Sequence, residues 1–289
     1  MTQIAKKNAL VIGSHGTIGK AITKELADNF NVFTLSQTDT DYSSESLAQQ
    51  QTKLAAHGAF HRIICCIGVL HNEALRPEKS LTQIDADKLA AYFRINSILP
   101  MLCLQSFIPL LAKPDPAQPN ANAVFACLSA MVGSIEENQL GGWYGYRSSK
   151  AALNMLIKTT AIEVRRKNKN AIIAAIHPGT TIGNLSDPFK KNINKQKYYS
   201  PDCSASRICD VMDKLTEKQS GDFFNWDGSR IAWWARCLQD IFSKHKKLTA
   251  HRLQDPVQWE KSLISISRTV AAQSWKALKR LICMQAKVS

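Results

Sequence analysis

Paired cysteines and metal-binding spacings are missing from this sequence. Its eight cysteines never occur in a C-x-x-C pair, the spacing typical of structural zinc sites. Most of them lie in apolar stretches, which favours buried free thiols in a reducing compartment over disulfides or metal ligands. They are Cys65, Cys66, Cys103, Cys127, Cys203, Cys209, Cys237 and Cys283.

Long hydrophobic runs are missing as well. No uninterrupted apolar stretch approaches the roughly 20 residues of a membrane-spanning helix, and the first residues, Met1-Thr-Gln-Ile-Ala-Lys-Lys, do not form the apolar stretch of a signal peptide. With 289 residues, 45% of them hydrophobic and 21% charged, the chain is typical of one large globular core. We therefore expect a cytoplasmic protein.

Carboxylates are scarce relative to basic side chains. The chain has 23 Asp and Glu against 37 Lys and Arg, a net charge of +14, and residues 235–289 carry +8 of it (11 basic minus 3 acidic). Trp259, Leu263, Ile266 and Val270 recur there at near-helical spacing, which predicts a basic helical extension. Docking on the protein's own domain is the preferred interpretation, and contact with an anionic membrane is the second. Nucleic acid is disfavoured because no recognition motif accompanies the charge.

Short apolar runs alternate with amphipathic segments along most of the chain. This alternation predicts an α/β fold, a doubly wound parallel sheet of Rossmann type, over residues 1–234, followed by a C-terminal helical extension over 235–289. The expected strands are residues 9–12, 31–35, 62–66, 123–128, 171–176 and 222–226, and the clearest amphipathic segments are 89–111 and 146–167.

A glycine-rich turn follows the first expected strand. Gly13, Gly16 and Gly19 have G-x-x-G-x-x-G spacing, and a helical pattern comes next. Glycines in this context let the backbone approach a pyrophosphate at a helix N-terminus, where unpaired N–H groups attract anions. A plain turn is the alternative. The candidate cofactor-binding residues of this turn are Gly13, Ser14, His15, Thr17 and Ile18.

A tyrosine and a lysine stand four residues apart at the start of a strong helical pattern. Tyr146 and Lys150 share one helix face, so the ammonium is expected to favour ionisation of the phenol. Such a tyrosine acts as an acid or base near neutral pH. Taken alone, the pair is more often a solvated surface pair.

The glycine turn and the Tyr-x-x-x-Lys motif together resemble the short-chain dehydrogenase/reductase family. Asn96 resembles the family's helix asparagine, Ser129 its catalytic serine, and Pro178-Gly179 the turn below the nicotinamide. The stretches Gly141-Gly-Trp-Tyr-Gly-Tyr-Arg-Ser-Ser-Lys, His177-Pro-Gly-Thr and Phe224-Asn-Trp-Asp-Gly look most like the C-factor branch. The resemblance covers roughly residues 8 to 234, with several motifs in the right order.

The resemblance implies an NAD(P)-dependent oxidoreductase acting on a small carbonyl or alcohol substrate, in a homo-oligomer. It assigns binding of the substrate oxygen to Ser129, proton donation to Tyr146, the nicotinamide ribose and the lowered tyrosine pKa to Lys150, and a proton-relaying water to Asn96. Ser134 remains an alternative to Ser129, because the usual adjacent second serine is Ala130 here. A nucleotide-binding signalling or scaffold protein with little turnover is the competing function.

The cofactor preference depends on the end of the second expected strand. Ser36 stands there without the carboxylate that usually binds the ribose of NAD, which favours NADP weakly over NAD. His15 and Lys20 either contact the extra phosphate or are simply exposed. Asp41 resembles the acidic residue beside the adenine, although Asp39 or Asp41 also suits the N-cap of the next helix.

Two positions depart from the family pattern. The expected N-x-x-G reads Cys65-Cys-Ile-Gly68, which lacks the asparagine and keeps Gly68 for the cofactor. Gly183 stands where a threonine is usual, which leaves Thr180 or Thr181 to hold the nicotinamide carboxamide. Residues 135–144 and 181–200 are expected to form the substrate pocket. Its aromatic residues, which suit an apolar or ring-bearing molecule or simply pack the loops, are Trp143, Tyr144, Phe189 and Tyr198.

Overall fold

The computed structural model describes residues 6–114, 122–183 and 198–233. Contacts divide the chain into a unit Met1–Ala235 and a unit Arg236–Ser289, and the described residues all belong to the first. The expected helical extension, and with it Cys237, Cys283 and the pocket residue Phe189, lies outside the described residues. The proposed division near residue 234 therefore stays a prediction.

Six parallel strands form the central sheet. Their order, β2-β1-β3-β4-β5-β8, reverses direction at β1, which is the pattern of a doubly wound fold. All six expected strands and the expected fold class are confirmed. The strands are β1 (Lys7–Ile12), β2 (Phe30–Leu35), β3 (Phe60–Cys65), β4 (Ala123–Leu128), β5 (Ala171–His177) and β8 (Phe223–Asn225).

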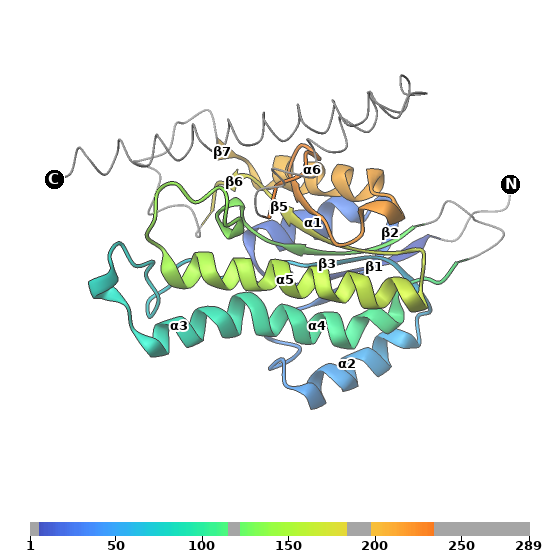
Figure 1. The fold of residues 1–289 in the computed structure, drawn as a ribbon. Helices are drawn as coiled ribbons and strands as arrows, with labels where there is room; N and C mark the ends of the chain where they lie inside the picture. The colour runs from blue at the N-terminus through green and yellow to red at the C-terminus, as the bar shows by residue number, and fades with distance from the viewer. Residues whose placement is uncertain (1–5, 115–121, 184–197, 234–289) are drawn as a thin grey trace, which may run out of the picture. The chain divides into compact units, whose positions relative to one another are not determined.

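Helices cover both faces of this sheet (Figure 1). One face carries α1 (Thr17–Leu26) and α6 (Pro201–Lys214), which pack against each other. The other carries α2 (Ser44–Ala55), α4 (Leu99–Phe107) and α5 (Tyr144–Lys167). Two short strands, β6 (Thr180–Thr181) and β7 (Tyr198–Tyr199), pair separately. Every parallel crossover must run over a face of the sheet, so each helix layer buries one face.

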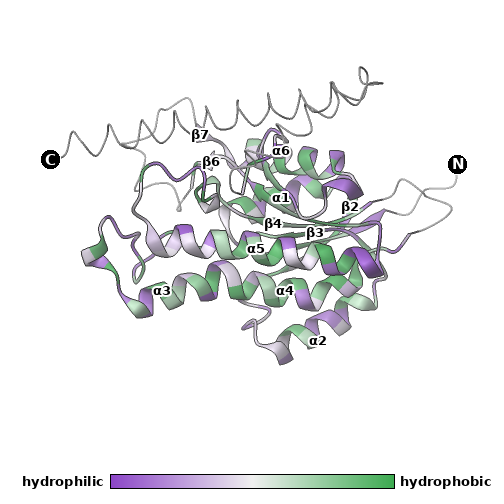
Figure 2. Ribbon diagram, in the orientation of Figure 1, coloured by the Kyte–Doolittle hydropathy of each residue, from purple (hydrophilic) through white to green (hydrophobic). Residues whose placement is uncertain are grey.

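Alternate residues of each strand point into two separate cores. In β1, Leu10 and Ile12 face the core beneath α2, α4 and α5, whereas Ala9 and Val11 face the core beneath α1 and α6. All four are fully buried. Figure 2 accordingly shows hydrophobic residues in the strands between the two helix layers, with hydrophilic residues at some strand ends. Burial on both faces explains why these strands read as continuous apolar runs in the sequence.

The segment expected as one amphipathic helix over residues 89–111 is a longer, irregular helical run, Ala86–Leu110. It comprises α3 (Ala86–Phe93), the π-helical segment η2 (Arg94–Ile98), α4 and the 3₁₀ turn η3 (Ile108–Leu110). By length and composition alone this run is apolar enough to cross a membrane, which the sequence reading did not anticipate. Its residues Cys103, Leu104 and Phe107 lie fully buried against the sheet, as in the core helix of a globular domain.

The described cysteines are free, as expected. Cys65, Cys103 and Cys127 are buried in the same core, and Cys65 lies opposite Cys127 in the β3–β4 register. Among the residues with described placement, no cluster of His, Cys, Asp or Glu has the arrangement of a metal site. These thiols therefore act as small apolar side chains in the core.

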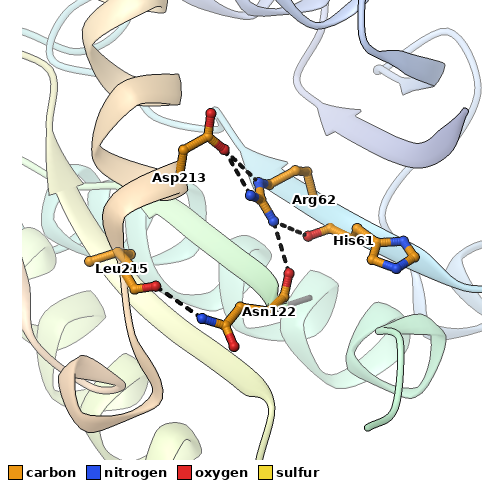
Figure 3. Close-up of polar contacts among 5 residues, drawn as sticks. All are labelled: His61, Arg62, Asn122, Asp213 and Leu215. Atoms are coloured by element: carbon orange, nitrogen blue, oxygen red, sulfur yellow. Dashed lines mark hydrogen bonds and ion pairs between the residues drawn. The ribbon is translucent and has the colours of Figure 1, made fainter. Parts of the chain in front are cut away.

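An arginine on β3 ties α6 to the sheet (Figure 3). The Arg62 guanidinium binds Asp213 Oδ1 through Nη2 at 2.7 Å and through Nε at 3.3 Å, and donates from Nη1 to the carbonyls of His61 and Asn122. The Asn122 amide in turn donates to the Leu215 carbonyl just beyond α6. The Arg62 side chain is only 14% exposed, so its charge depends on these partners.

We expect Asp213→Ala to lower the free energy of unfolding by about 1 kcal/mol, because it removes the carboxylate partner of a largely buried guanidinium. The corresponding drop in Tm is roughly 2–4 °C. Glu163→Ala is the control, since its ion pair with Lys167 is exposed on both sides and should contribute almost nothing. Equal melting temperatures for wild type and Asp213→Ala would contradict this role.

Candidate active site and cofactor site

The first and third glycines of the turn between β1 and α1 leave no room for side chains. Gly13 has φ +79° and donates its N–H to the Leu35 carbonyl at 2.7 Å, which joins the turn to the end of β2. A Cβ on Gly19 would lie 2.3 Å from the Gly13 carbonyl oxygen. The second glycine, Gly16, is the N-cap of α1. Gly13 and Gly19 are therefore required by the backbone conformation and by close backbone approach, whereas a Cβ on Gly16 would make only an ordinary contact, 3.4 Å from the Gly13 carbonyl oxygen.

The N-terminus of α1 suits an anion. Its N-cap, Gly16, offers no side-chain hydrogen bond to the first turn, so the helix lacks a side-chain cap among the described residues. Ser14 is buried, Ile18 is half-buried, and His15 and Thr17 are exposed beside the turn. Uncapped N–H groups and the helix dipole at this end fit the pyrophosphate of a dinucleotide.

A carboxylate does lie at the end of β2, contrary to the reading of Ser36 as free for a phosphate. Asp39 accepts hydrogen bonds from the Ser36 N–H at 2.8 Å and from the Ser36 hydroxyl at 2.7 Å, and these bonds lower the pKa of Asp39. Neither Asp39 nor Asp41 caps the next helix, because Ser43 is the N-cap of α2. Asp41 accepts from the Ser43 N–H instead, at 2.9 Å.

Asn96 holds the loop that follows β3. It is fully buried in η2, where its amide oxygen accepts from the Val69 N–H at 2.8 Å and its amide nitrogen donates to the Val69 carbonyl and to Ser149 Oγ. The adjacent Gly68 is closely surrounded, since a Cβ would lie 3.1 Å from Lys150 Nζ and 3.3 Å from Asn96 Oδ1. The fold thus brings Asn96, Gly68 and Lys150 together from three separate segments.

Tyr146 and Lys150 are both buried on one face of α5, which excludes the alternative of a solvated surface pair. Burial raises the pKa of Tyr146, and the nearby phenol of Tyr92 raises it further. This direction corrects the expectation that Lys150 lowers it. The Lys150 ammonium donates to the Leu128 carbonyl at 2.9 Å, at the end of β4. Burial lowers the pKa of Lys150 to about 8, and the thiols of Cys65 and Cys127 partly offset this.

Both candidate serines donate their hydroxyls to partners other than Tyr146. Ser129 Oγ donates to Asn154 Oδ1 at 2.6 Å, and Ser134 Oγ donates to the Ala232 carbonyl at 2.5 Å. The small residue between them, Ala130, packs instead in the same apolar cluster as Tyr146. Ser129 stays the predicted oxygen-binding residue, and a hydrogen bond to the substrate would require its hydroxyl to turn.

The turn after β5 is supported by aromatic rings. Gly179 has φ +77°, and a Cβ there would lie 3.0 Å from both Trp226 Cδ1 and Tyr199 Cδ2. The Arg207 guanidinium stacks on the Tyr199 ring at 3.9 Å and on the Trp226 ring at 4.1 Å. Thr181 shares a hydrogen bond with Ser204 at 2.8 Å. These rings, stacked with the Arg207 guanidinium, and the Thr181–Ser204 hydrogen bond therefore support the turn that contains Pro178 and Gly179.

The residues that follow Gly179 are also held by contacts with distant segments. Thr180 and Thr181 form β6 and pair with Tyr198 and Tyr199. Gly183 lies against the first residue of α1, because a Cβ there would meet Thr17 Cγ2 at 2.9 Å. The chain after β5 thus returns to the glycine turn, which places both predicted cofactor segments side by side.

Three residues of this region, Asn154, Glu78 and Arg207, were not predicted from the sequence to belong to the site. Asn154 lies two turns after Tyr146, binds Ser129, and donates to the Gly133 carbonyl at 3.3 Å. Its i+8 spacing from Tyr146 is the signal that was available. Glu78 and Arg207 carried no such signal, because each acts through residues distant in the chain.

We expect Lys150→Met to stabilise the protein while disabling it. The folded-state pKa of Lys150, about 8, lies below the ordinary value of 10.5, so burial of the ammonium costs on the order of 3 kcal/mol. This cost is fully present below pH 8, falls as the pH rises from 8 to 10.5, and vanishes above. Thermal unfolding should give a higher Tm for Lys150→Met at pH 7 and a smaller difference at pH 10.

The control for this experiment is Lys158→Met on the same helix. Lys158 is 42% exposed and lies 3.8 Å from Asp222, so its replacement should give no stabilisation at either pH. A lower Tm for Lys150→Met at pH 7, with Lys158→Met unchanged, would show that the buried ammonium stabilises the fold.

Comparison with known proteins agrees with this geometry. Residues 46–194, about half of the chain, match the family model described as short chain dehydrogenase. A 1-hydroxy-2-glutathionyl-2-methyl-3-butene dehydrogenase of Rhodococcus sp. (strain AD45) is 28% identical over 150 residues, 52% of this chain and 61% of that protein. The C-signal protein of Myxococcus xanthus is 28% identical over 154 residues, 53% of this chain and 84% of that protein.

Solved structures share the fold. An NADPH-bound carbonyl reductase from chicken fatty liver superposes with a TM-score of 0.65 at 21% identity, covering 80% of this chain and 96% of the reductase. The family match and the C-signal relative confirm the resemblance inferred from the motifs. The chain belongs to the short-chain dehydrogenase family of NAD(P)-dependent oxidoreductases.

Proposed function

We propose that the protein transfers a hydride between a nicotinamide dinucleotide and a small carbonyl or alcohol compound, with Tyr146 as the proton donor or acceptor. The single observation that carries this assignment is the burial of Tyr146 and Lys150 on one face of α5, with Lys150 Nζ against Gly68 at the carboxyl ends of β3 and β4. Charged and phenolic groups are rarely buried together without a functional reason.

The residues present fit a dinucleotide. Its pyrophosphate would lie at the uncapped N-terminus of α1, its ribose beside Lys150, and its nicotinamide above the turn of Pro178 and Gly179. The bound nicotinamide supplies or accepts the hydride. The cradle is built of glycines whose added Cβ atoms would collide with backbone or with Lys150, as a closely approached cofactor requires.

The protein's own residues handle the proton. Burial keeps the Tyr146 phenol protonated at neutral pH, which suits an acid that gives a proton to a carbonyl oxygen as charge develops on it. The Lys150 ammonium, held at the Leu128 carbonyl, is proposed to hold the nicotinamide ribose. Asn96 keeps the loop of Gly68 and Val69 in place for both groups.

A second function, nucleotide binding with little turnover, is favoured by one observation. Ala130, which has no side-chain hydrogen-bond donor, lies in the same apolar cluster as Tyr146, while Ser129 donates to Asn154. Weak stabilisation of the substrate oxygen would leave cofactor binding intact and slow the chemistry. The relatedness to a C-signal protein is consistent with this alternative.

We propose NADP as the preferred cofactor, with a modest margin over NAD. Ser36 and the exposed His15 lie where the extra phosphate would bind, and one solved relative of the fold carries NADPH. The margin is modest because Asp39 already occupies the Ser36 hydroxyl and would repel a phosphate.

The substrate pocket is proposed to lie beside Trp143. Its ring contacts that of Tyr146 edge to face, with centroids 6.3 Å apart, so an apolar or ring-bearing substrate would meet an aromatic wall next to the acid.

We also propose that the protein is a cytoplasmic homo-oligomer. We propose that the basic residues 235–289 associate with the protein's own domain in preference to an anionic membrane.

We expect Tyr146→Phe to reduce turnover by about 10²- to 10⁴-fold, because it deletes the proton donor and keeps the ring. A panel of aldehydes, ketones and alcohols with NADPH and NADH, followed by absorbance of the reduced nicotinamide, identifies the substrate. Calorimetric titration should then give the same cofactor affinity for wild type and variant. Near-normal turnover in Tyr146→Phe would reject the assigned acid, and the absence of cofactor binding in wild type would reject the proposed function.

We expect Asp39→Asn to shift the ratio of NADPH to NADH affinity toward NADPH by about five- to tenfold, because it removes a negative charge beside the proposed phosphate position. Asp28→Asn, an exposed carboxylate in the turn before β2, serves as the control and should leave the ratio unchanged. Titration with both reduced cofactors measures the shift, and an unchanged ratio in Asp39→Asn would place the phosphate elsewhere.

A further inference from the structure

The chain enters α5 through three consecutive left-handed residues. Gly141, Gly142 and Trp143 have φ values of +65°, +64° and +54°. Trp143 is the N-cap of α5 and provides no side-chain hydrogen bond to the helix. A bulky residue in this conformation costs on the order of 1 kcal/mol or more and persists only where its surroundings hold it.

Glu78, in the loop between β3 and α3, supplies those surroundings. Its backbone carbonyl accepts the Trp143 N–H at 2.5 Å, and its carboxylate oxygen Oε2 accepts the Gly145 N–H at 3.1 Å. The Glu78 residue is only 2% exposed. A side chain 67 positions away in the sequence therefore caps the helix that carries Tyr146.

The Glu78 carboxylate, Gly145 and the Tyr92 ring are closely packed around this cap. A Cβ on Gly145 would lie 2.4 Å from Tyr92 Cδ2 and 2.9 Å from Glu78 Oε1, so only glycine fits between the cap and the Tyr92 ring. Tyr92 donates its hydroxyl to the Leu70 carbonyl at 2.6 Å, and its ring meets that of Tyr146 edge to face at 6.5 Å. Glu78, the Tyr92 ring and the Tyr146 ring are therefore packed next to one another in a row.

Burial of the Glu78 carboxylate carries a free-energy cost. Glu78 Oε1 is buried and makes no hydrogen bond with any residue in the described part of the chain. An acceptor buried in this way costs free energy, which the positive N-terminal end of the 24-residue helix α5 offsets. A stabilising role alone would be served better by a conventional Ser or Asp N-cap at position 143. The observed arrangement fixes the helix start against the loop after β3.

We propose that Glu78 is a positioning residue that caps α5 from the neighbouring loop and thereby fixes the Tyr146 phenol for proton transfer. The expected effect on turnover rests on the proposed function. Glu78 contacts neither of the groups that handle the proton. It acts through Gly145, the residue directly before Tyr146, and through Tyr92.

Three full-length variants test this proposal. Glu78→Ala removes the cap, Glu78→Gln keeps an oxygen that can accept the Gly145 N–H, and Glu73→Ala changes an exposed carboxylate of the same loop as a control. We expect Glu78→Ala to lower kcat for reduction of 4-nitrobenzaldehyde, or of the best carbonyl compound from the panel, by about 10- to 100-fold. KM and NADPH affinity should change by less than about threefold, and Glu78→Gln and Glu73→Ala should retain near-wild-type kcat.

Amide hydrogen exchange separates this proposal from the proposed function, because it needs no substrate. Glu78→Ala should speed exchange at residues 144–148, whereas Glu78→Gln should restore protection there. Faster exchange confined to Glu78→Ala supports the cap even if no turnover is found. Unchanged exchange in Glu78→Ala, a kcat within twofold of wild type, or a Glu78→Gln variant no better than Glu78→Ala would overturn the proposal.

Discussion

Burial of both faces of a six-stranded parallel sheet is the constraint on which the rest of this structure depends. Parallel strands require crossovers, and helices on both faces direct every strand the same way, so all carboxyl ends meet at one edge. Gly13, Gly68, Ser129 and Pro178 each follow a strand at that edge. Residues spread over most of the chain become neighbours there because of topology, before any specific side-chain contact forms.

Helix α5 then converts that edge into a reactive site. Its buried face presents Tyr146, Lys150 and Asn154 at successive turns, so one rigid element aligns the phenol, the ammonium and the partner of Ser129. The cost is visible in the lowered pKa of Lys150 and the raised pKa of Tyr146, both caused by burial. Among the described residues the partner of the Lys150 ammonium is the Leu128 carbonyl and not a carboxylate, so the ammonium is poorly solvated and ready to interact with a bound anion.

Two features of the site weaken the chemistry assigned to it. Ala130 lies in the same apolar cluster as Tyr146, where a hydroxyl would strengthen the site, and Asp39 at the end of β2 accepts the hydroxyl hydrogen bond of Ser36. Each was difficult to interpret from the sequence, because a motif position tells which residue is present and not where its side chain points. The distinction between Ser129 and Ser134 shows the same limit, since both hydroxyls are committed to partners more than 20 residues away.

The sequence by itself determined the six strands, the glycine turn and the Tyr146 and Lys150 pair, because hydrophobic period, glycine spacing and helical repeat are local properties of the chain. Only the tertiary structure decided the electrostatics and the supports. The sign of the Tyr146 pKa shift depends on how much protein surrounds the phenol, and the cap on α5 comes from Glu78, 67 residues earlier. Desolvation and long-range hydrogen bonds arise only when distant segments pack together, so no local pattern records them.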